Sequence, residues 1–177
     1  MADKEDIIVY RRIETSLGQL IVASHSSDII MCRWADAPRN GYILERIAGH
    51  LSAEIAGGSS EAIESAEQAI RQYLENGATL PEISIRLLGT PLQLSVWEAL
   101  RGIPCGTTAT YSSIAQAVGR PDAVRAVAAA IGMNPIEIII PCHRVISVSG
   151  ALTGYAGGID RKRELLNLES SHHSTIL

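Results

Sequence analysis

Cys142 and His143 are neighbours in the second half of the chain, between a stiff β-branched run (136–140) and a glycine-rich loop. This position favours a nucleophile that is held in place. Neighbouring side chains of an extended chain point to opposite sides, so we expect a water to carry a proton between thiol and imidazole. Glu169, at the end of a helix predicted over 161–169, is a candidate for orienting the imidazole. By composition alone, an isolated Cys-His pair is more often structural than catalytic.

The cysteines and histidines do not have the spacing of a disulfide framework or a metal site. The three cysteines, Cys32, Cys105 and Cys142, cannot all pair with one another. A tetrahedral zinc site needs four closely spaced ligands, and His25, Cys32 and His50 do not supply such a set. We therefore expect scattered surface or core residues and no bound metal.

A helix-turn-helix is predicted between residues 110 and 131. Thr110 can cap a first helix, which runs to Val118 and stops at Gly119. Asp122 can cap a second helix over 123–131. Two short helices joined by such a turn form the DNA-binding motif, although many helical pairs in proteins that do not bind nucleic acid look the same.

The second of these helices is an unusual reader of DNA, because Arg125 is the only long polar side chain over 124–130. A helix that reads the major groove needs several hydrogen-bonding side chains. A smooth helix with one long cation suits the minor groove and a wedge that unstacks a base. The alternative is a buried alanine-rich helix.

The net charge of −4 is unevenly distributed along the chain. Residues 1–100 carry 8 Lys and Arg against 14 Asp and Glu, whereas residues 101–163 carry 7 against 3. A polyanion-binding face is therefore expected in the second stretch, since only the contact face must be basic. A solvated surface accounts for most local imbalances of this size.

The first half has the pattern of a small antiparallel sheet with helices. Its β-rich runs cover 7–10, 18–23, 29–34 and 83–87. The helices that the apolar spacing predicts outside the helix-turn-helix cover 42–56, 61–75 and 92–101. A flexible break is expected at 57–60. We therefore predict an α+β fold, in which this sheet is followed by a mainly helical C-terminal domain containing the helix-turn-helix.

Length and composition are those of a globular protein. The 177 residues are 46% hydrophobic and 19% charged, which suits one domain or one and a half and excludes a disordered chain. No run approaches the roughly 18 apolar residues of a membrane helix, and the acidic N-terminus lacks the apolar core of a signal peptide. We expect a soluble intracellular protein.

The stretch from Gly89 to Glu169 resembles the DNA-binding, C-terminal domain of the O6-alkylguanine-DNA alkyltransferases, also named methylated-DNA–protein-cysteine methyltransferases. The motifs that carry the resemblance are Gly89-Thr90-Pro91, Val96-Trp97, Ile103-Pro104-Cys105-Gly106, Thr110-Tyr111, Arg125-Ala126-Val127, Asn134-Pro135, Ile139-Ile140-Pro141-Cys142-His143-Arg144-Val145 and Gly154-Tyr155. The Pro-Cys-His-Arg-Val core in its β-branched lead-in is specific. The first half fits the family without specific motifs, so the resemblance covers nearly the whole chain.

The resemblance implies a ribonuclease-H-like α/β domain over 1–88, a DNA-binding alkyltransferase domain over 89–170 and a flexible tail over 171–177. It also implies double-stranded DNA as the partner, bound through the minor groove by a monomer, with no membrane contact and no cofactor. The location would be the cytoplasm, with association to the nucleoid, in a prokaryote, or the nucleus in a eukaryote.

The implied reaction is the repair of O6-alkylguanine, chiefly O6-methylguanine, with O4-methylthymine repaired less well. Cys142 matches the acceptor that takes the alkyl group irreversibly, in a single turnover. His143 and Glu169 match the water-bridged relay that makes the thiolate. Asn134 matches the hinge between the recognition helix and the active-site strand.

Further matches concern DNA and the flipped base. Arg125 matches the finger that replaces the extruded nucleotide, and Ala126 and Ala129 share its helix. Tyr111 matches the residue that rotates the backbone phosphate and lines the guanine pocket, where it can protonate the leaving guanine. The residues that complete this pocket are Tyr155, Val145 through its carbonyl and Ala156 through its N–H.

Five positions depart from the family pattern. Leu92 replaces a frequent Phe, and Ala109 and Ala156 each replace a Ser found in some members. Cys32 alone cannot build the structural zinc site that some members carry. Glu137 is expected close to the pocket lip, where a neutral residue is common, which leaves sensitivity to free-base inhibitors open.

Three other functions remain as alternatives. A non-catalytic alkyltransferase-like protein would bind damage without accepting the alkyl group, and Cys142 argues against it. A helix-turn-helix regulator would need neither the Pro-Cys-His-Arg segment nor Glu169. A cysteine hydrolase would turn over and would use a histidine distant in sequence.

Overall fold

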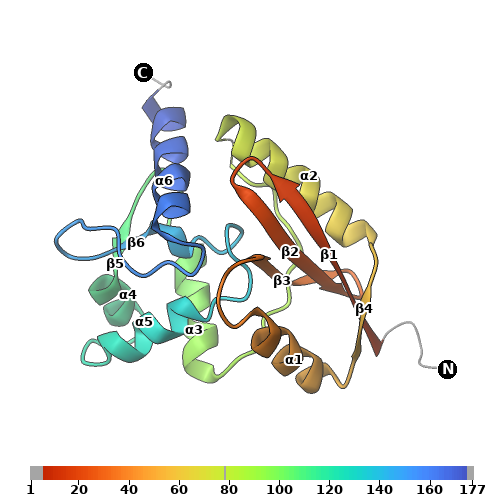
Figure 1. Cartoon of the computed structure of the whole chain (residues 1–177). Helices are drawn as coiled ribbons and strands as arrows, with labels where there is room; N and C mark the ends of the chain where they lie inside the picture. Colours follow the sequence, from red (N-terminus) through yellow and green to blue (C-terminus); the bar gives the residue numbers. More distant parts are fainter. Residues whose placement is uncertain (1–5, 78, 175–177) are drawn as a thin grey trace.

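A four-stranded sheet with two helices forms the N-terminal half of the protein, and shorter helices and loops form most of the C-terminal half (Figure 1). The computed structural model describes residues 6–77 and 79–174. This architecture confirms the α+β fold class that the sequence predicts. Among the described residues, no helix is long and apolar enough to span a membrane.

The sheet has the strand order β3-β2-β1-β4. Its strands are β1 (Ile7–Thr15), β2 (Gly18–His25), β3 (Asp28–Trp34) and β4 (Glu54–Gly57). The first three strands form an antiparallel meander, as expected, whereas β4 pairs in parallel with β1. The helix expected over 42–56 is therefore wrong at its end: α1 (Asn40–Leu51) stops where Ser52 adopts a left-handed conformation.

The two helices of this half cover opposite faces of the sheet. Ile63 of α2 (Glu61–Asn76) shares a core cluster with Val22, and Ile43 of α1 shares the other cluster with Ala23. Val22 and Ala23 are neighbours on β2, and neighbours on a strand point to opposite faces. Both faces of the sheet are thus buried.

The segment before α2 is ordered by pairing and capping, which corrects the flexible break expected at 57–60. Gly57 is the last residue of β4. The Ser60 side chain accepts a hydrogen bond from the Ile63 N–H and so caps α2, which ends at Gly77 in the left-handed region. The strand expected over 83–87 is reduced to a single bridge, between Ile85 and β3.

The C-terminal half consists of short elements that surround the Cys-His segment. They are α3 (Pro91–Arg101), β5 (Ala109–Thr110), α4 (Tyr111–Ala117), α5 (Val124–Gly132), a 3-10 turn (Cys142–Arg144), β6 (Val145–Ile146) and α6 (Ile159–Ser174). The helices α4 and α5 pack together and confirm the helix-turn-helix. The expected cap Asp122 is wrong, because Ala123 is the N-cap of α5 and no side chain caps it.

The β-branched run 136–140 is a tight turn and not the strand that its composition suggests. Ile138 has a positive φ of 72°, and the Ile140 N–H donates to the Ile136 carbonyl. The side chain of Asn134 closes this turn, since its Nδ2 donates to the Ile140 carbonyl and its Oδ1 accepts from the Ile136 N–H. These hydrogen bonds override the local preference for an extended chain.

The last helix is longer than expected. α6 begins at Ile159 and continues beyond Glu169 to Ser174, so it includes the first part of the segment 171–177 that was expected to be a tail. Residues 175–177 lie outside the described part. The expected domain boundary at residue 88 stays a prediction.

Candidate active site

Cys142 is the first residue of the 3-10 turn, and only 5% of its surface is exposed. The extended geometry expected for the Cys-His pair is therefore wrong, because the chain turns tightly at this point. Burial and the nearby Glu137 carboxylate raise the pKa of the Cys142 thiol to about 12, although the Asn134 side chain lowers it. At rest Cys142 is therefore a thiol, and a thiolate at this position would need a base to form.

His143 is completely buried and bonded to Glu169. Its Nε2 lies 2.8 Å from Oε1 of Glu169. Burial lowers the pKa of His143, so the imidazole is neutral at pH 7. Because Nε2 donates its hydrogen to the carboxylate, the lone pair lies on Nδ1, which has no hydrogen-bond partner among the described residues. This ring is thus set up to accept a proton at Nδ1.

Glu169 is held by donors from two different elements, the 3-10 turn and α2. In addition to His143, Tyr73 of α2 donates its hydroxyl at 2.6 Å, and Arg144 donates from Nε at 3.0 Å and from Nη2 at 2.8 Å. Burial alone raises the pKa of Glu169, but the hydrogen bonds from His143 and Arg144 outweigh it and hold the pKa well below its usual range. The carboxylate stays ionised and fixes the imidazole.

An open hollow of about 830 Å³ lies beside α5. Its described lining includes five residues that the sequence predicts for the guanine pocket or DNA, namely Tyr111, Arg125, Ala129, Tyr155 and Ala156. The hydroxyl of Tyr111, the first residue of α4, donates to the Thr153 carbonyl at 2.8 Å. The structure thus brings the loop over 153–156, here called the pocket loop, and the predicted DNA helix α5 to one cavity.

The other predicted residues do not line this hollow. Cys142 and Asn134 are buried, and Val145 of β6 is buried too. Ala126 is an exposed residue of α5 that does not line the hollow. The thiol therefore lies beneath the surface.

Glu137 is completely buried, which corrects its expected position near the pocket lip. Its Oε2 accepts from the Trp34 N–H at 3.3 Å and lies 4.0 Å from Nε of Arg33, which is also buried. Burial, only partly opposed by the Arg33 charge, raises the pKa of Glu137 to about 7. The side chain turns inward because β3 supplies a cation beneath the 136–140 turn.

The chain is similar over nearly its whole length to proteins of one family. A family model described as 6-O-methylguanine DNA methyltransferase, DNA binding domain, matches residues 91–171. The methylated-DNA–protein-cysteine methyltransferase of Mycobacterium tuberculosis is 41% identical over 93% of this chain and 94% of its own. The chain belongs to this methyltransferase family. That membership confirms the resemblance found in the sequence. It also confirms the prediction that the protein is a DNA-repair methyltransferase.

Solved structures agree with the assignment to the methyltransferase family. A crystal structure of Mycobacterium tuberculosis OGT in complex with DNA has a TM-score of 0.79 and 39% identity, covering 93% of this chain and 94% of that one. The Mycobacterium tuberculosis O6-methylguanine methyltransferase gives a TM-score of 0.77 at 40% identity, with the same coverage. The inducible Bacillus subtilis methyltransferase is 52% identical over 56% of each chain.

Lys162 is a residue of the methyltransferase site that sequence reasoning missed. Its ammonium is buried and donates to the Val145 carbonyl at 2.5 Å and the Thr153 carbonyl at 2.8 Å. It therefore fixes β6 relative to the pocket loop. The sequence does carry a signal, because Lys162, Leu165 and Glu169 recur at the spacing of one helix face. The structure shows that this face of α6 is buried.

Tyr155 is held by the N-terminal half of the methyltransferase, which sequence reasoning also missed. Trp34 of β3 donates from Nε1 to the Tyr155 hydroxyl at 3.0 Å. Gly157 permits this approach, because a Cβ there would lie 2.1 Å from the Trp34 ring. The Arg161 guanidinium stacks 4.5 Å above the same ring and donates to Asp36. The pocket loop thus depends on contacts with β3.

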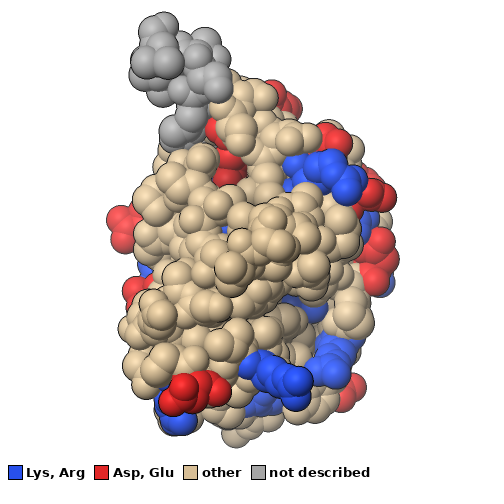
Figure 2. Space-filling view, turned by 90° about the vertical axis from the view of Figure 1, so that its left-hand side faces the viewer, with Lys and Arg blue, Asp and Glu red and all other residues tan. Residues whose placement is uncertain are grey.

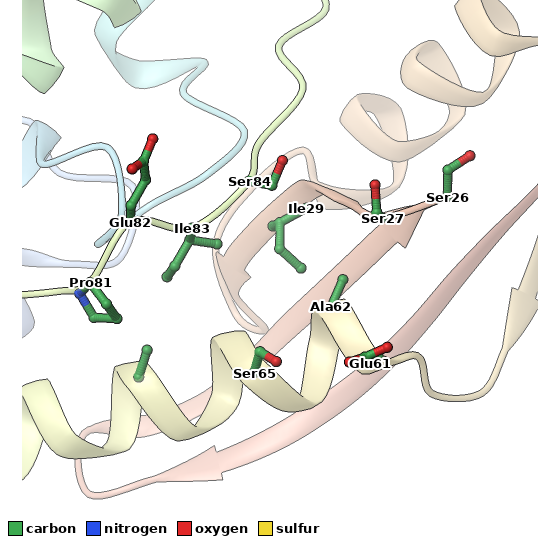
Figure 3. A pocket seen from close by; sticks show the side chains of 11 residues that line it. Ser26, Ser27, Ile29, Glu61, Ala62, Ser65, Pro81, Glu82, Ile83 and Ser84 are labelled. Atoms are coloured by element: carbon green, nitrogen blue, oxygen red, sulfur yellow. The ribbon is translucent and has the colours of Figure 1, made fainter.

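The C-terminal half and a second hollow differ in the charge of their surfaces. Figure 2 shows the face of the C-terminal half, which is largely uncharged, with Lys and Arg toward its lower and right-hand edges. The second hollow, of about 530 Å³, lies between α2 and the segment 81–84 (Figure 3). Its described lining has two glutamates, Glu61 and Glu82, and no cation. This acidic hollow is ill suited to a polyanion. The 830 Å³ hollow beside α5, which Arg125 lines and which is called the Arg125 hollow below, has a cation in its wall.

The three residues considered as metal ligands do not gather. His25 and Cys32 are buried on β2 and β3, and His50 is exposed on α1. Among the described residues, no group of three or more His, Cys, Asp or Glu side chains is placed to hold a metal ion.

Proposed function

We propose that the chain repairs O6-alkylguanine in double-stranded DNA by transferring the alkyl group irreversibly to Cys142. The substrate is chiefly O6-methylguanine, with O4-methylthymine a poorer one. The observation that carries the proposal is the buried Cys142 thiol next to a histidine whose Nε2 is fixed by Glu169 and whose Nδ1 has no partner among the described residues.

In the proposed reaction, the thiol proton passes through a bridging water to Nδ1 of His143, and Glu169 stabilises the imidazolium that forms. The thiolate attacks the alkyl carbon, a C–S bond forms and the C–O6 bond breaks. Tyr111 donates a proton to the guanine that leaves. The proton held on the His143 imidazolium then restores the Tyr111 hydroxyl, and the imidazole becomes neutral again. Asn134 supports the thiolate, since its side chain favours the charged form of Cys142.

A base in the duplex is unreachable, so the target nucleotide must flip, at a cost of a few kcal/mol. Arg125 fills the space left in the stack, while Ala126 and Ala129 let α5 enter the minor groove closely. Tyr111 rotates the backbone phosphate of the nucleotide that flips. The flipped guanine is bound by Tyr155 together with the Val145 carbonyl and the Ala156 N–H.

The reaction ends after one transfer. A thioether is a poor leaving group, and the proposed reaction has no step that removes the alkyl group from Cys142. The protein acts as a monomer where the DNA is, in the cytoplasm with the nucleoid of a prokaryote or in the nucleus of a eukaryote. No cofactor takes part in any step.

The test is a mass spectrum of the protein after it is mixed with excess duplex that contains O6-methylguanine. One methyl group should be gained per protein, on the peptide that contains Cys142. Cys142→Ala should gain none, whereas Cys105→Ala should gain one. Binding without a mass gain would instead indicate a non-catalytic damage-binding protein. Repeated turnover would contradict irreversible transfer.

A further inference from the structure

A smaller hollow of about 400 Å³ adjoins the Arg125 hollow on the side of the N-terminal half. Its described lining consists of Arg39, Tyr42, Arg46, Gln93 and Met133. Arg39 and Met133 line both hollows, and Nη1 of Arg39 donates to the Met133 sulfur at 3.6 Å. Because Met133 directly follows α5, the surface around the proposed DNA helix continues onto α1.

The arginines of this surface have no carboxylate partners. Among the described residues, Arg39, Arg46 and Arg125 form no ion pair, and Arg46 donates instead to the neutral Gln93 side chain at 3.2 Å. Some exposed arginines elsewhere are paired, namely Arg71 with Glu67, Arg101 with Glu98 and Arg163 with Asp160, whereas the exposed Arg12, Arg86 and Arg120 are scattered singly over other elements and loops. Three unpaired guanidinium groups therefore gather along two connected hollows.

The backbone and the aromatic side chain here also suit a ligand surface. Arg39 has a positive φ of 66°, a conformation that is unfavourable for a residue with a side chain and that aims it from the start of α1 toward α5. Tyr42 is 58% exposed, which is high for an aromatic side chain. Glu45, the one acidic residue of α1, lines neither hollow.

We infer that Arg39 and Arg46, with Tyr42 between them, bind backbone phosphates of the same DNA duplex that α5 enters. This inference rests on the proposed function. A helix about 10–12 Å across fills a minor groove only about 6 Å wide, so both flanking strands are pressed against the elements beside it. In the proposed complex Tyr111 of α4 meets one strand, and the surface of Arg39, Tyr42 and Arg46 lies beside Met133, at the C-terminal end of α5, where the second strand would continue. The N-terminal half thus extends the DNA contact.

The test compares the salt dependence of DNA binding between the unaltered full chain and the variant Arg39→Asn/Arg46→Gln. Asn tolerates the left-handed conformation at position 39, so the fold is retained. Each phosphate contact contributes about 0.9 to the slope of log affinity against log salt. Between 50 and 200 mM salt, the affinity of the unaltered chain should fall about tenfold more than that of the variant.

Two further variants serve as controls. Arg71→Ala removes an exposed arginine on α2 and should leave the slope unchanged, whereas Arg39→Lys/Arg46→Lys keeps both charges and should keep the slope. Methyl transfer from the free base should be equal in all of them. An unchanged slope in the neutral variant, or an equal loss in the lysine variant, would overturn the phosphate contact. Failure of the unaltered chain to methylate Cys142 would instead count against the proposed function.

Discussion

The Arg33 guanidinium donates a hydrogen bond of 2.5 Å from Nη1 to the backbone carbonyl of Asn134. Its Nε donates to Oδ1 of Asn40 at 2.9 Å and its Nη2 to the Pro38 carbonyl at 3.1 Å. One buried side chain of β3 therefore joins the start of α1 to the residue whose side chain closes the turn before Cys142. The N-terminal half is therefore part of the support of the turn that precedes Cys142.

Arg33→Met should destabilise the protein strongly at pH 8, above the pKa of about 7 of Glu137, because it leaves the buried carboxylate without its cation. Breaking a buried pair in this way costs about 3–5 kcal/mol in the free energy of unfolding, measured by urea denaturation. Glu137→Gln in addition should recover part of the loss, since no uncompensated charge remains. Strictly additive losses in the double variant would show that the two side chains are not coupled.

Glu137 should make stability fall as pH rises through neutrality. Its pKa of about 7 in the folded protein lies above the ordinary value of 4.5, so the folded state keeps a proton that the unfolded chain has lost. The free energy of unfolding therefore decreases between about pH 4.5 and 7, by up to about 3 kcal/mol.

Glu137→Gln should remove this slope, because the amide resembles the protonated acid. The variant should match the unaltered protein near pH 5 and exceed its melting temperature near pH 8. An identical difference at both pH values would show that Glu137 does not titrate in this window.

How well the sequence predicts this site depends on how far apart in the sequence the contacting residues lie. The cap of α4 is local, so Thr110 marks the start of this helix correctly, and Thr90 caps α3 in the same local way. The turn at 136–140 was not predictable from its β-branched residues, because the side chain of Asn134 sets it through hydrogen bonds. Local composition fails where a side chain competes for the backbone.

The buried partners of the site were the least predictable part. Glu137 looks like a surface residue until Arg33, more than a hundred positions earlier, is seen beneath it. Tyr73 likewise reaches Glu169 from a helix whose apolar spacing indicates only a core position. Their roles follow from contacts between distant segments, which neither periodicity nor spacing records.

Glu169→Gln should slow methyl transfer and raise the pH at which transfer reaches half of its maximum. The neutral amide no longer stabilises the imidazolium that receives the thiol proton, and Arg144 loses its ion pair. The affinity for methylated duplex should stay nearly constant, because Glu169 is buried away from the Arg125 hollow. Tyr73→Phe is the matched control, since it removes one hydrogen bond and keeps the charge. An unchanged pH–rate profile would remove Glu169 from the relay.

Arg125→Ala should weaken repair of duplex DNA far more than reaction with the free alkylated base. Arg125 is exposed, lines the hollow and forms no ion pair with the described residues, so it is free to enter the stack. Its loss affects extrusion of the nucleotide and not bond formation. The two rates are compared at equal protein concentration, with Arg101→Ala as a control on the exposed end of α3. Equal losses on both substrates would assign Arg125 to another step.

Methylated protein should be less stable than the free form, because Cys142 has almost no spare space. Its thiol is 5% exposed, and Asn134 and Ile140, which close the turn before it, are almost fully buried. Overpacking in such a place costs about 1–3 kcal/mol, against a total stability of about 5–15 kcal/mol. The displacement should reach α5 through Asn134, which lies two residues beyond its end, and should loosen the contact with DNA.

The melting temperature and DNA affinity are measured before and after stoichiometric methylation. Each kcal/mol should lower the melting temperature by about 2–4 °C for a chain of this size. Cys142→Ala treated with the same methylated duplex is the control and should show no change, because it accepts no methyl group. If the methylated protein melts at the same or a higher temperature, the pocket has room for the methyl group. Release of DNA would then need a cause other than crowding at Asn134.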